Sequence, residues 1–531
     1  MAIGIERRND GGGAVLVAPG LLTGTTLRDV ATKDTSIIPT ESAAGPAEHF
    51  DVLIVGAGIS GVGGAHHLKE QCPDKSFVVL ESQAGFGGTW RTHTYPGIRS
   101  DSDLYTFGYR FKPWTGAPIA TAAEIMTYMS EVIADNNLDD HIRYNHRIVS
   151  ADWSSPNNRW TIVATHVGSG QMRTFTAAFL WMCQGYYRHS EGYTPQWEGM
   201  DRFEGRIVHP QTWPTDLDYA DKLVICIGSG ATAATLVPAI APRCEHVTML
   251  QRSPTYFVTG RNANDLADIL REIDTPEEWI HWIIRKKVLH DQANVTRRSF
   301  EEPDALAADL LAGVRAFLPD EVVDKHFTPT YRPWRQRLAF IPDADLFVGI
   351  QSGKASVVTD EIETFTEKGI LLKSGTELEA DIIVTATGFD LNVLGDIAFR
   401  VDDSPLDFHD AVTYRGMMFT GVPNMLWVFG YFRASWTLRA DLLADFVCRL
   451  LRHMDAIGAA SVTPMLRNEE ANDPRLPWID PDNFNPGYIQ RGLHLMPKQL
   501  VHDPWRMSQD YSRDKDELPL VDLDDGTLRY S

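Results

Sequence analysis

Two glycine-rich segments, each set between an apolar run and a predicted helix, constrain the fold of this chain most strongly. The first reads FDVLIVGAGISGVGGAHHLKEQ over residues 50–71 and predicts a buried parallel strand, a tight turn and a helix. Its glycines follow the spacing G-x-G-x-x-G, in which the first allows the turn, the second lets the backbone approach a pyrophosphate, and the third lets the helix pack against the strand. We therefore predict an α/β fold with a dinucleotide at this turn, bound by Gly56, Gly58, Ser60 and Gly61.

An acidic residue follows at the place where such a unit needs one. Glu81 closes the next predicted strand, SFVVLE, twenty residues after Gly61. A carboxylate there can accept hydrogen bonds from ribose hydroxyls. The order of strand, loop, helix, strand and acid favours dinucleotide binding over the alternative, an ordinary glycine turn in an α/β unit.

The second segment, KLVICIGSGATAATLVPAIAPRCEHVTMLQRSP, repeats the unit with a different ending. It predicts a strand over 223–227, a glycine loop, a helix and a strand over 246–250. Where the first unit has an acid, this one continues into Arg252 and Ser253, and an arginine with a hydroxyl suits a 2′-phosphate, which indicates NADPH. The alternative for Arg252 is a solvated cation at a strand end. The predicted contacts of this second dinucleotide are Gly228, Ser229, Gly230, Thr232, Arg252 and Ser253.

Charge and cysteine usage restrict the partners. The formal net charge is −22 and no long lysine or arginine run occurs, which argues against nucleic acid or an anionic membrane as a partner. The five cysteines show neither C-x-x-C nor metal-ligand spacing, so we expect a reduced compartment and no metal site. Because no stretch approaches the roughly 18 apolar residues of a spanning helix, we expect no transmembrane segment and a cytoplasmic location.

Between the two loops, residues 203–214 read FEGRIVHPQTWP. The pattern F-x-G-x-x-x-H-x-x-x-W-P resembles that of Baeyer-Villiger monooxygenases, the ketone-oxygenating branch of the flavin-containing monooxygenases. The segments GGTW, YPGIRSDSD, YRPWRQRL and ATGFD extend the resemblance over about residues 49–500. RSDSDLYTFGYRFKPW, ASWTLRADLL and DNFNPGYIQRGLHLMPK are similar to the subgroup that includes the ethionamide-activating monooxygenase.

The resemblance implies an enzyme with two cofactors. NADPH would reduce FAD, and the reduced flavin would use molecular oxygen to convert a ketone into an ester or lactone, with sulfides oxidised as well. It also implies that Arg337 is the catalytic arginine, that Asp101 orients it, and that Thr89 and Trp90 contact the flavin. His209 would couple domain movement without touching substrate. From residue chemistry alone, Arg337 could instead belong to a solvated loop patch with Arg332 and Arg335.

The resemblance further implies two Rossmann-like domains, one for FAD and one for NADPH, with a helical insertion. At 531 residues and 43% apolar composition the chain is long enough for more than one core. We expect Trp279, Trp282 and Ile283 of the insertion to lie in the core, and the strand within 378–392 to return the chain to the first domain. The expected boundaries are 1–48 for an N-terminal extension, 49–187 for the first part of the FAD domain, 188–377 for the NADPH domain with helices at about 262–325, and 378–531 for the second part of the FAD domain with the C-terminal region.

Two other functions are compatible with parts of this pattern. A monooxygenase acting on sulfur or nitrogen would need no arginine to stabilise a substrate oxyanion, and the Trp213-Pro214 ending argues against it as the only activity. A noncatalytic NADPH-sensing flavoprotein would not need the complete set of motifs. The expected substrates are therefore a small ketone or thioether and molecular oxygen. Gln336 differs from the lysine of many relatives, so the preference for NADPH depends on Arg252 and Ser253.

Overall fold

The computed structural model describes residues 47–531, so the predicted extension lies almost entirely outside the described residues. The first sheet has the strand order β20-β19-β4-β5-β6-β1-β2-β3, with β23 beside the end of β6. β1 pairs in parallel with both β2 and β6, as its continuous apolar run requires. The strands are β1 (Glu48–Val55), β2 (Phe77–Leu80), β3 (Ile142–Arg143), β4 (His146–Ser154), β5 (Arg159–His166), β6 (Met172–Met182), β19 (Ala398–Val401), β20 (Ser404–Pro405) and β23 (Met425–Trp427).

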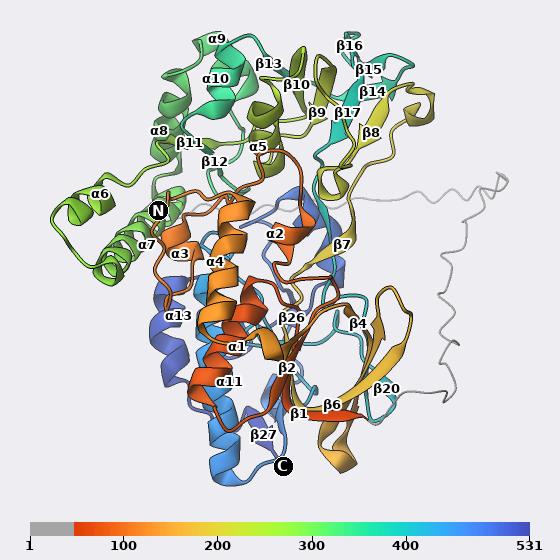
Figure 1. Cartoon of the computed structure of the whole chain (residues 1–531), viewed down its shortest axis with the longest axis vertical. Coiled ribbons are helices and arrows are strands. Elements are labelled where there is room, and N and C mark those ends of the chain that lie inside the picture. Colours follow the sequence, from red (N-terminus) through yellow and green to blue (C-terminus); the bar gives the residue numbers. More distant parts are fainter. Residues whose placement is uncertain (1–46) are drawn as a thin grey trace, which may run out of the picture. The chain divides into compact units, whose positions relative to one another are not determined.

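Helices from distant parts of the chain pack together beside this sheet. α1 (Ile59–Gln71) follows the first glycine loop, and α11 (Trp436–Ile457) comes from the C-terminal part and packs against it. Figure 1 shows α1, α4 (Ala122–Asp135) and α11 side by side. Val52 and Ile54 of β1 are fully buried in this core. The first domain is thus assembled from both ends of the described chain.

The second sheet is parallel throughout, with the order β13-β10-β9-β17-β8. Its strands are β8 (Arg206–Val208), β9 (Leu223–Ile227), β10 (His246–Gln251), β13 (Ala355–Thr359) and β17 (Ile382–Thr385), and α5 (Ala231–Ile240) follows its glycine loop. β17 lies between β9 and β8, so the expectation that this strand returns the chain to the first domain, and with it the boundary at residue 378, is wrong. The chain returns only after Thr385. An apolar run of this kind identifies a buried strand but not the sheet that it joins.

Two short strands carry the chain between the sheets. β7 (Tyr187–Gly192) leaves the first domain, β18 (Phe389–Leu391) returns to it, and the two pair in antiparallel register. The ends of both strands lie at the wall of the cavity described below.

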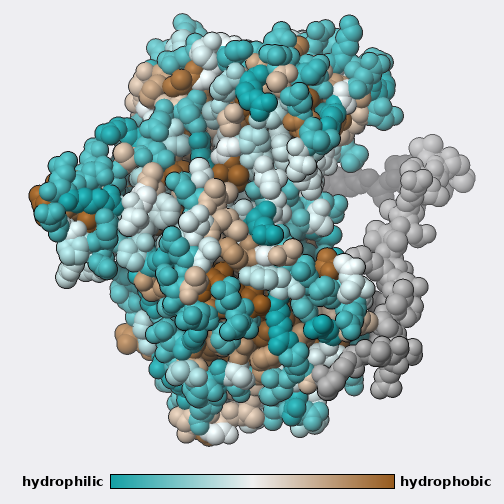
Figure 2. Space-filling model, viewed as in Figure 1, coloured by the Kyte–Doolittle hydropathy of each residue, from teal (hydrophilic) through white to brown (hydrophobic). Residues whose placement is uncertain are grey.

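The helical stretch expected at about 262–325 contains α6 (Asp265–Glu272), α7 (Glu277–Glu301), α8 (Pro303–Arg315) and α9 (Asp320–His326). The prediction that Trp279 and Trp282 lie in the core is wrong, because their side chains are 59% and 49% exposed. α7 instead buries Ile280 and Ile284. Helical periodicity shows that a helix has an apolar face. It does not show which of several apolar residues are buried when the helix carries more of them than one face holds. Figure 2 shows a few apolar groups at the edge of the otherwise hydrophilic helical projection at the left of the view.

Further elements pack around α5. β11 (Phe257–Gly260) pairs with β12 (Ala339–Pro342), and α10 (Asp345–Gln351) packs against α5. Over residues 47–531, no helix has the length and apolar character needed to cross a membrane.

Candidate active site

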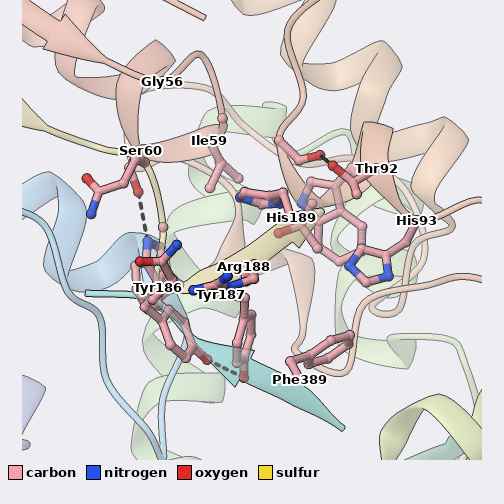
Figure 3. Close-up of a pocket in the computed structure, with 18 of the residues that line it drawn as sticks. Gly56, Ile59, Ser60, Thr92, His93, Tyr186, Tyr187, Arg188, His189 and Phe389 are labelled. Atoms are coloured by element: carbon pink, nitrogen blue, oxygen red, sulfur yellow. Dashed lines mark hydrogen bonds between the residues drawn. The ribbon is translucent and has the colours of Figure 1, made fainter. Parts of the chain in front are cut away.

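A cavity of about 840 Å³ lies between the two glycine loops. Its wall includes Gly56, Gly58 and Glu81 from the first loop region and Gly230 and Thr232 from the second. Figure 3 shows the part of this wall that carries Tyr186, Tyr187 and Phe389. The cavity therefore reaches from one predicted dinucleotide loop to the other.

The glycines of the first loop serve distinct purposes. Gly56 adopts a φ of +96°, which a side chain would strain. A Cβ at Gly61 would lie 1.9 Å from the carbonyl oxygen of Gly56, whereas a Cβ at Gly58 would have only an ordinary contact, 3.7 Å from the Cα of Gly88. Gly61 is thus required by the packing of the protein itself, and the open space over Gly58 is available to a ligand.

Glu81 is held rigidly at the edge of this loop. The residue is only 5% exposed, its Oε2 accepts a hydrogen bond from the backbone N–H of Ala57 at 2.7 Å, and its Oε1 accepts one from the N–H of Gln83 at 2.8 Å. Each carboxylate oxygen can accept more than one hydrogen bond. Glu81 therefore holds the loop in place and keeps acceptor capacity for a ligand at the cavity wall.

The GGTW segment curls around the same end of the cavity. Gly87 and Gly88 have φ values of +121° and +53°, and the N–H of Gly87 donates to the carbonyl oxygen of Ala57 at 2.9 Å. This turn places Thr89 and Trp90, which begin α2 (Thr89–Thr92), in the cavity wall.

Ser60 also lines the cavity, and its hydroxyl is fixed by a neighbour. The indole Nε1–H of Trp436 donates to Ser60 Oγ at 2.7 Å, a contact drawn in Figure 3. Because the serine oxygen acts as the acceptor, its own proton remains available to a ligand.

The second glycine loop repeats the turn. Gly228 has a φ of +134°, and a Cβ there would lie 2.3 Å from the carbonyl oxygen of Ala386, whereas a Cβ at Gly230 would meet nothing within 4 Å. Ser229 Oγ lies 2.9 Å from Thr255 Oγ1. Thr255 lines the cavity and was missed from the sequence, because a threonine after a strand carries no distinctive signal.

Arg252 and Ser253 lie beyond this loop, outside the cavity wall. Both are exposed at the end of β10. Within residues 47–531, Arg252 forms no ion pair. Its guanidinium is therefore available to pair with an anion.

The two predicted catalytic residues meet across the cavity. Arg337 Nη2 lies 2.9 Å from Asp101 Oδ2, although one belongs to the loop before β12 and the other to the YPGIRSDSD loop. Asp101 raises the pKa of Arg337, so the guanidinium stays charged. Its side chain is 34% exposed, and it lines the cavity together with Asp101. Arg337 is thus paired with Asp101 in the cavity wall.

The loop that carries Asp101 makes a second ion pair. Arg99 Nη1 lies 2.5 Å from Asp345 Oδ2 at the start of α10. Arg99 and Asp101 thus tie this loop to α10 and to the loop before β12.

Aromatic residues that sequence reasoning did not assign to the site form another wall of the cavity. Tyr186 Oη donates to Tyr187 Oη at 2.8 Å, and the ring of Tyr187 lies against those of Phe389 and Tyr488. The only available signal was the tandem tyrosine in WMCQGYY, directly after the first domain's last central strand, where side chains commonly reach a ligand site.

His209 lies beside the two connecting strands, and it is absent from the cavity wall. Its Nδ1 accepts from the N–H of Gln211 at 3.1 Å, so Nε2 carries the proton and donates to the carbonyl oxygen of Gly388 at 3.1 Å. Burial lowers the pKa of His209, which keeps the ring neutral. A Cβ at Gly192 would lie 1.9 Å from the His209 ring. The histidine is therefore wedged between the outgoing and the returning connection.

Comparison with known proteins places this architecture in a family. A model described as "Flavin-binding monooxygenase-like" matches residues 118–266, and one described as "NAD(P)-binding Rossmann-like domain" matches residues 54–115. The "FAD-containing monooxygenase EthA" of Mycolicibacterium smegmatis is 45% identical over 487 residues, which cover 91% of this chain and 97% of that protein.

Solved structures share the fold. A steroid monooxygenase bound to NADP superposes with a TM-score of 0.71 at 21% identity and covers 91% of this chain and 99% of its own. Cyclohexanone monooxygenase from Rhodococcus sp. Phi1 bound to NADP+ gives a TM-score of 0.70 at 21% identity, with 91% and 99% covered. The predicted fold class, with two Rossmann-like domains, is confirmed.

Proposed function

The chain belongs to the family of flavin-binding monooxygenases, and on this premise we propose that it is a Baeyer-Villiger monooxygenase. It uses NADPH, FAD and molecular oxygen to insert one oxygen atom beside a ketone carbonyl, which gives an ester or a lactone. The observation that carries the proposal is the Arg337–Asp101 pair at 2.9 Å, which holds a permanent positive charge in the wall of the cavity between the dinucleotide loops.

The residues of the first loop fit FAD. The space over Gly58, which a Cβ would narrow, accepts the pyrophosphate, and the free hydroxyl proton of Ser60 adds a donor. Glu81 accepts from the ribose hydroxyls, and Thr89 and Trp90 contact the flavin end. When bound, FAD accepts a hydride from NADPH and activates molecular oxygen for transfer to the substrate.

The second loop fits NADPH. Gly230 offers an open approach to the pyrophosphate, and Gly228, Ser229 and Thr232 complete the turn. Arg252 supplies the charge for the 2′-phosphate, with the hydroxyl of Ser253 beside it.

The role of Arg337 follows from where charge develops. When a ketone carbonyl is attacked by an oxygen nucleophile, its oxygen becomes negative, and a fixed cation in a cavity stabilises that charge. Arginine suits this role because its guanidinium group stays charged, and the ion pair with Asp101 orients it. Thioethers are a second substrate class for the same cavity. Their oxidation does not need Arg337, because oxygen transfer to sulfur creates no such oxyanion.

Two further assignments complete the proposal. His209, wedged between the connecting strands, couples movement of the two domains during turnover. The five cysteines are free and buried, which fits a reducing compartment, and we place the activity in the cytoplasm.

The test measures product formed and NADPH consumed with a panel of linear, cyclic and aryl ketones and thioethers. With a ketone that the wild type converts, Arg337→Ala should lower ester formation about a hundred-fold and divert NADPH oxidation to hydrogen peroxide. Arg335→Ala is the matched control, because Arg335 lies in the same loop but does not line the cavity. Wild-type turnover and coupling in Arg337→Ala would remove the proposed role, and a wild type that oxidises no ketone would overturn the function.

A further inference from the structure

The hydroxyl pair formed by Tyr186 and Tyr187 has no role in the function proposed above. The two phenolic oxygens are 2.8 Å apart and the two rings lie 4.0 Å apart, centroid to centroid. Figure 3 shows the rings descending together from the chain, with the hydroxyls joined below and Phe389 beside them. Both residues line the cavity, as does Arg337.

The direction of this hydrogen bond leaves one proton free. Tyr186 donates to Tyr187, so the hydroxyl proton of Tyr187 needs another acceptor. Among residues 47–531, no acceptor receives it. A phenol that is itself hydrogen-bonded at oxygen is a stronger donor than an isolated one, since chains of hydrogen bonds polarise each other.

The surroundings hold the pair in place and keep it protonated. Tyr186 stacks on Trp436 at 5.1 Å, and Tyr187 packs against Phe389 at 4.7 Å and edge-on against Tyr488 at 5.7 Å. Burial raises the pKa of both Tyr186 and Tyr187. Neither phenol therefore ionises near neutral pH, and both act as hydrogen-bond donors.

We propose that Tyr187 is a second donor to the substrate carbonyl oxygen, beside Arg337, and that Tyr186 is a positioning residue that polarises and orients it. This inference rests on the proposed function and adds a specificity-determining group to it. Arg337 supplies a positive charge, and Tyr187 supplies a directional hydrogen bond. Together they favour substrates whose oxygen becomes negative during the reaction.

The overall reaction balances without any change at the tyrosine. One ketone, one O2, one NADPH and one proton give one ester, one NADP+ and one water. The bond between the two oxygen atoms of O2 and one carbon–carbon bond beside the carbonyl are broken. Two carbon–oxygen single bonds to the inserted oxygen atom form, and the second oxygen atom leaves as water. Tyr187 donates a hydrogen bond as the charge develops and keeps its proton.

The experiment compares two reactions in the same protein. Tyr187→Phe should lower kcat for ester formation about ten- to a hundred-fold while leaving FAD content and the rate of thioether oxidation within about two-fold of wild type. Tyr186→Phe should act in the same direction but less, about three- to ten-fold, and in kcat rather than KM. The readout is the ratio of ester to sulfoxide formed when a ketone and a thioether compete for one enzyme sample.

A matched control removes a phenol elsewhere. Tyr530 Oη donates to the carbonyl oxygen of Leu523, and Tyr530 does not line the cavity, so Tyr530→Phe should leave the ester-to-sulfoxide ratio unchanged. An unchanged ratio in Tyr187→Phe, whether both activities persist or both fall together, overturns the inference. A wild type that makes sulfoxide but no ester instead overturns the proposed function, so the two failures are distinguishable.

Discussion

The two dinucleotide loops share one architecture and differ at two places. In the first loop the third glycine, Gly61, has no room for a Cβ, whereas the second loop has Ala233 there, with its methyl group fully buried. After the following strand, the first unit buries an acid, Glu81, and the second exposes a cation, Arg252. In the proposed function, the shared turn binds the pyrophosphate, and the residues at the strand end distinguish a ribose hydroxyl from a 2′-phosphate.

Matching backbone hydrogen bonds identify equivalent positions in the two loops. The N–H of Gly56 donates to the carbonyl oxygen of Leu80, and that of Gly228 donates to the carbonyl oxygen of Leu250, both at 2.8 Å. Glu81 and Gln251 are therefore equivalent. Gln251 is only 2% exposed, and its Nε2 donates to the carbonyl oxygen of His326 at 2.6 Å and to Thr359 Oγ1 at 2.9 Å. The second loop uses this position for packing, and the proposed function assigns recognition of the 2′-phosphate to the next residue, Arg252.

The largest effect is expected where the loops differ in packing. Gly61→Ala places a methyl group against the carbonyl oxygen of Gly56 and should cost about 3 kcal/mol of stability or more. Ala233→Gly is the matched change in the second loop and should cost about 1 kcal/mol. Urea denaturation of the two variants measures the difference, and equal losses would show that the third position is equivalent in both loops.

The second effect separates the cofactors. Gly58→Ala adds a methyl group that the protein itself tolerates but that occupies the space for the pyrophosphate, so FAD affinity should fall about a hundred-fold in a folded protein. Gly230→Ala should retain FAD and weaken NADPH instead. Bound flavin absorbance and NADPH titration report the two affinities. If both variants lose the same cofactor, the assignment of one loop to each dinucleotide fails.

The third prediction concerns the equivalent strand-end positions. Gln251→Glu restores the acid of the first loop, but a carboxylate cannot donate to the carbonyl oxygen of His326, so stability should fall by about 2 kcal/mol. The variant should gain no preference for NADH. Thermal unfolding and the ratio of kcat/KM for the two coenzymes provide the test, and a stable variant that prefers NADH would contradict this interpretation of Gln251.

The smallest effect is expected at the exposed cation. Arg252→Ala should raise KM for NADPH about tenfold, or about 1.4 kcal/mol, and hardly change KM for NADH, which lacks the 2′-phosphate. The loss stays modest because an exposed charge is screened by solvent. Initial rates with both coenzymes decide the point. Equal changes for NADPH and NADH would assign the specificity to another residue.

The sequence by itself determined the features that depend on short stretches of chain. The glycine spacing predicted the first turn, because the clash at Gly61 involves the carbonyl oxygen of Gly56 in the same loop. The apolar runs predicted the central strands of both sheets, and the order of Glu81 and Arg252 after those strands predicted two different dinucleotides. The motifs that resemble a known family also identified Arg337 and Asp101 as candidates.

Only the tertiary structure decided how distant segments meet. It brought Asp101 to 2.9 Å from Arg337, placed β17 in the second sheet, and turned Trp279 outward while Ile280 is buried. It also set the hydroxyl of Tyr187 against that of Tyr186. Local patterns cannot supply such facts, because a strand's apolar run fits either sheet and a helix with several apolar residues can bury more than one face. The choice depends on the free energy of packing against segments hundreds of residues away, which no short stretch contains.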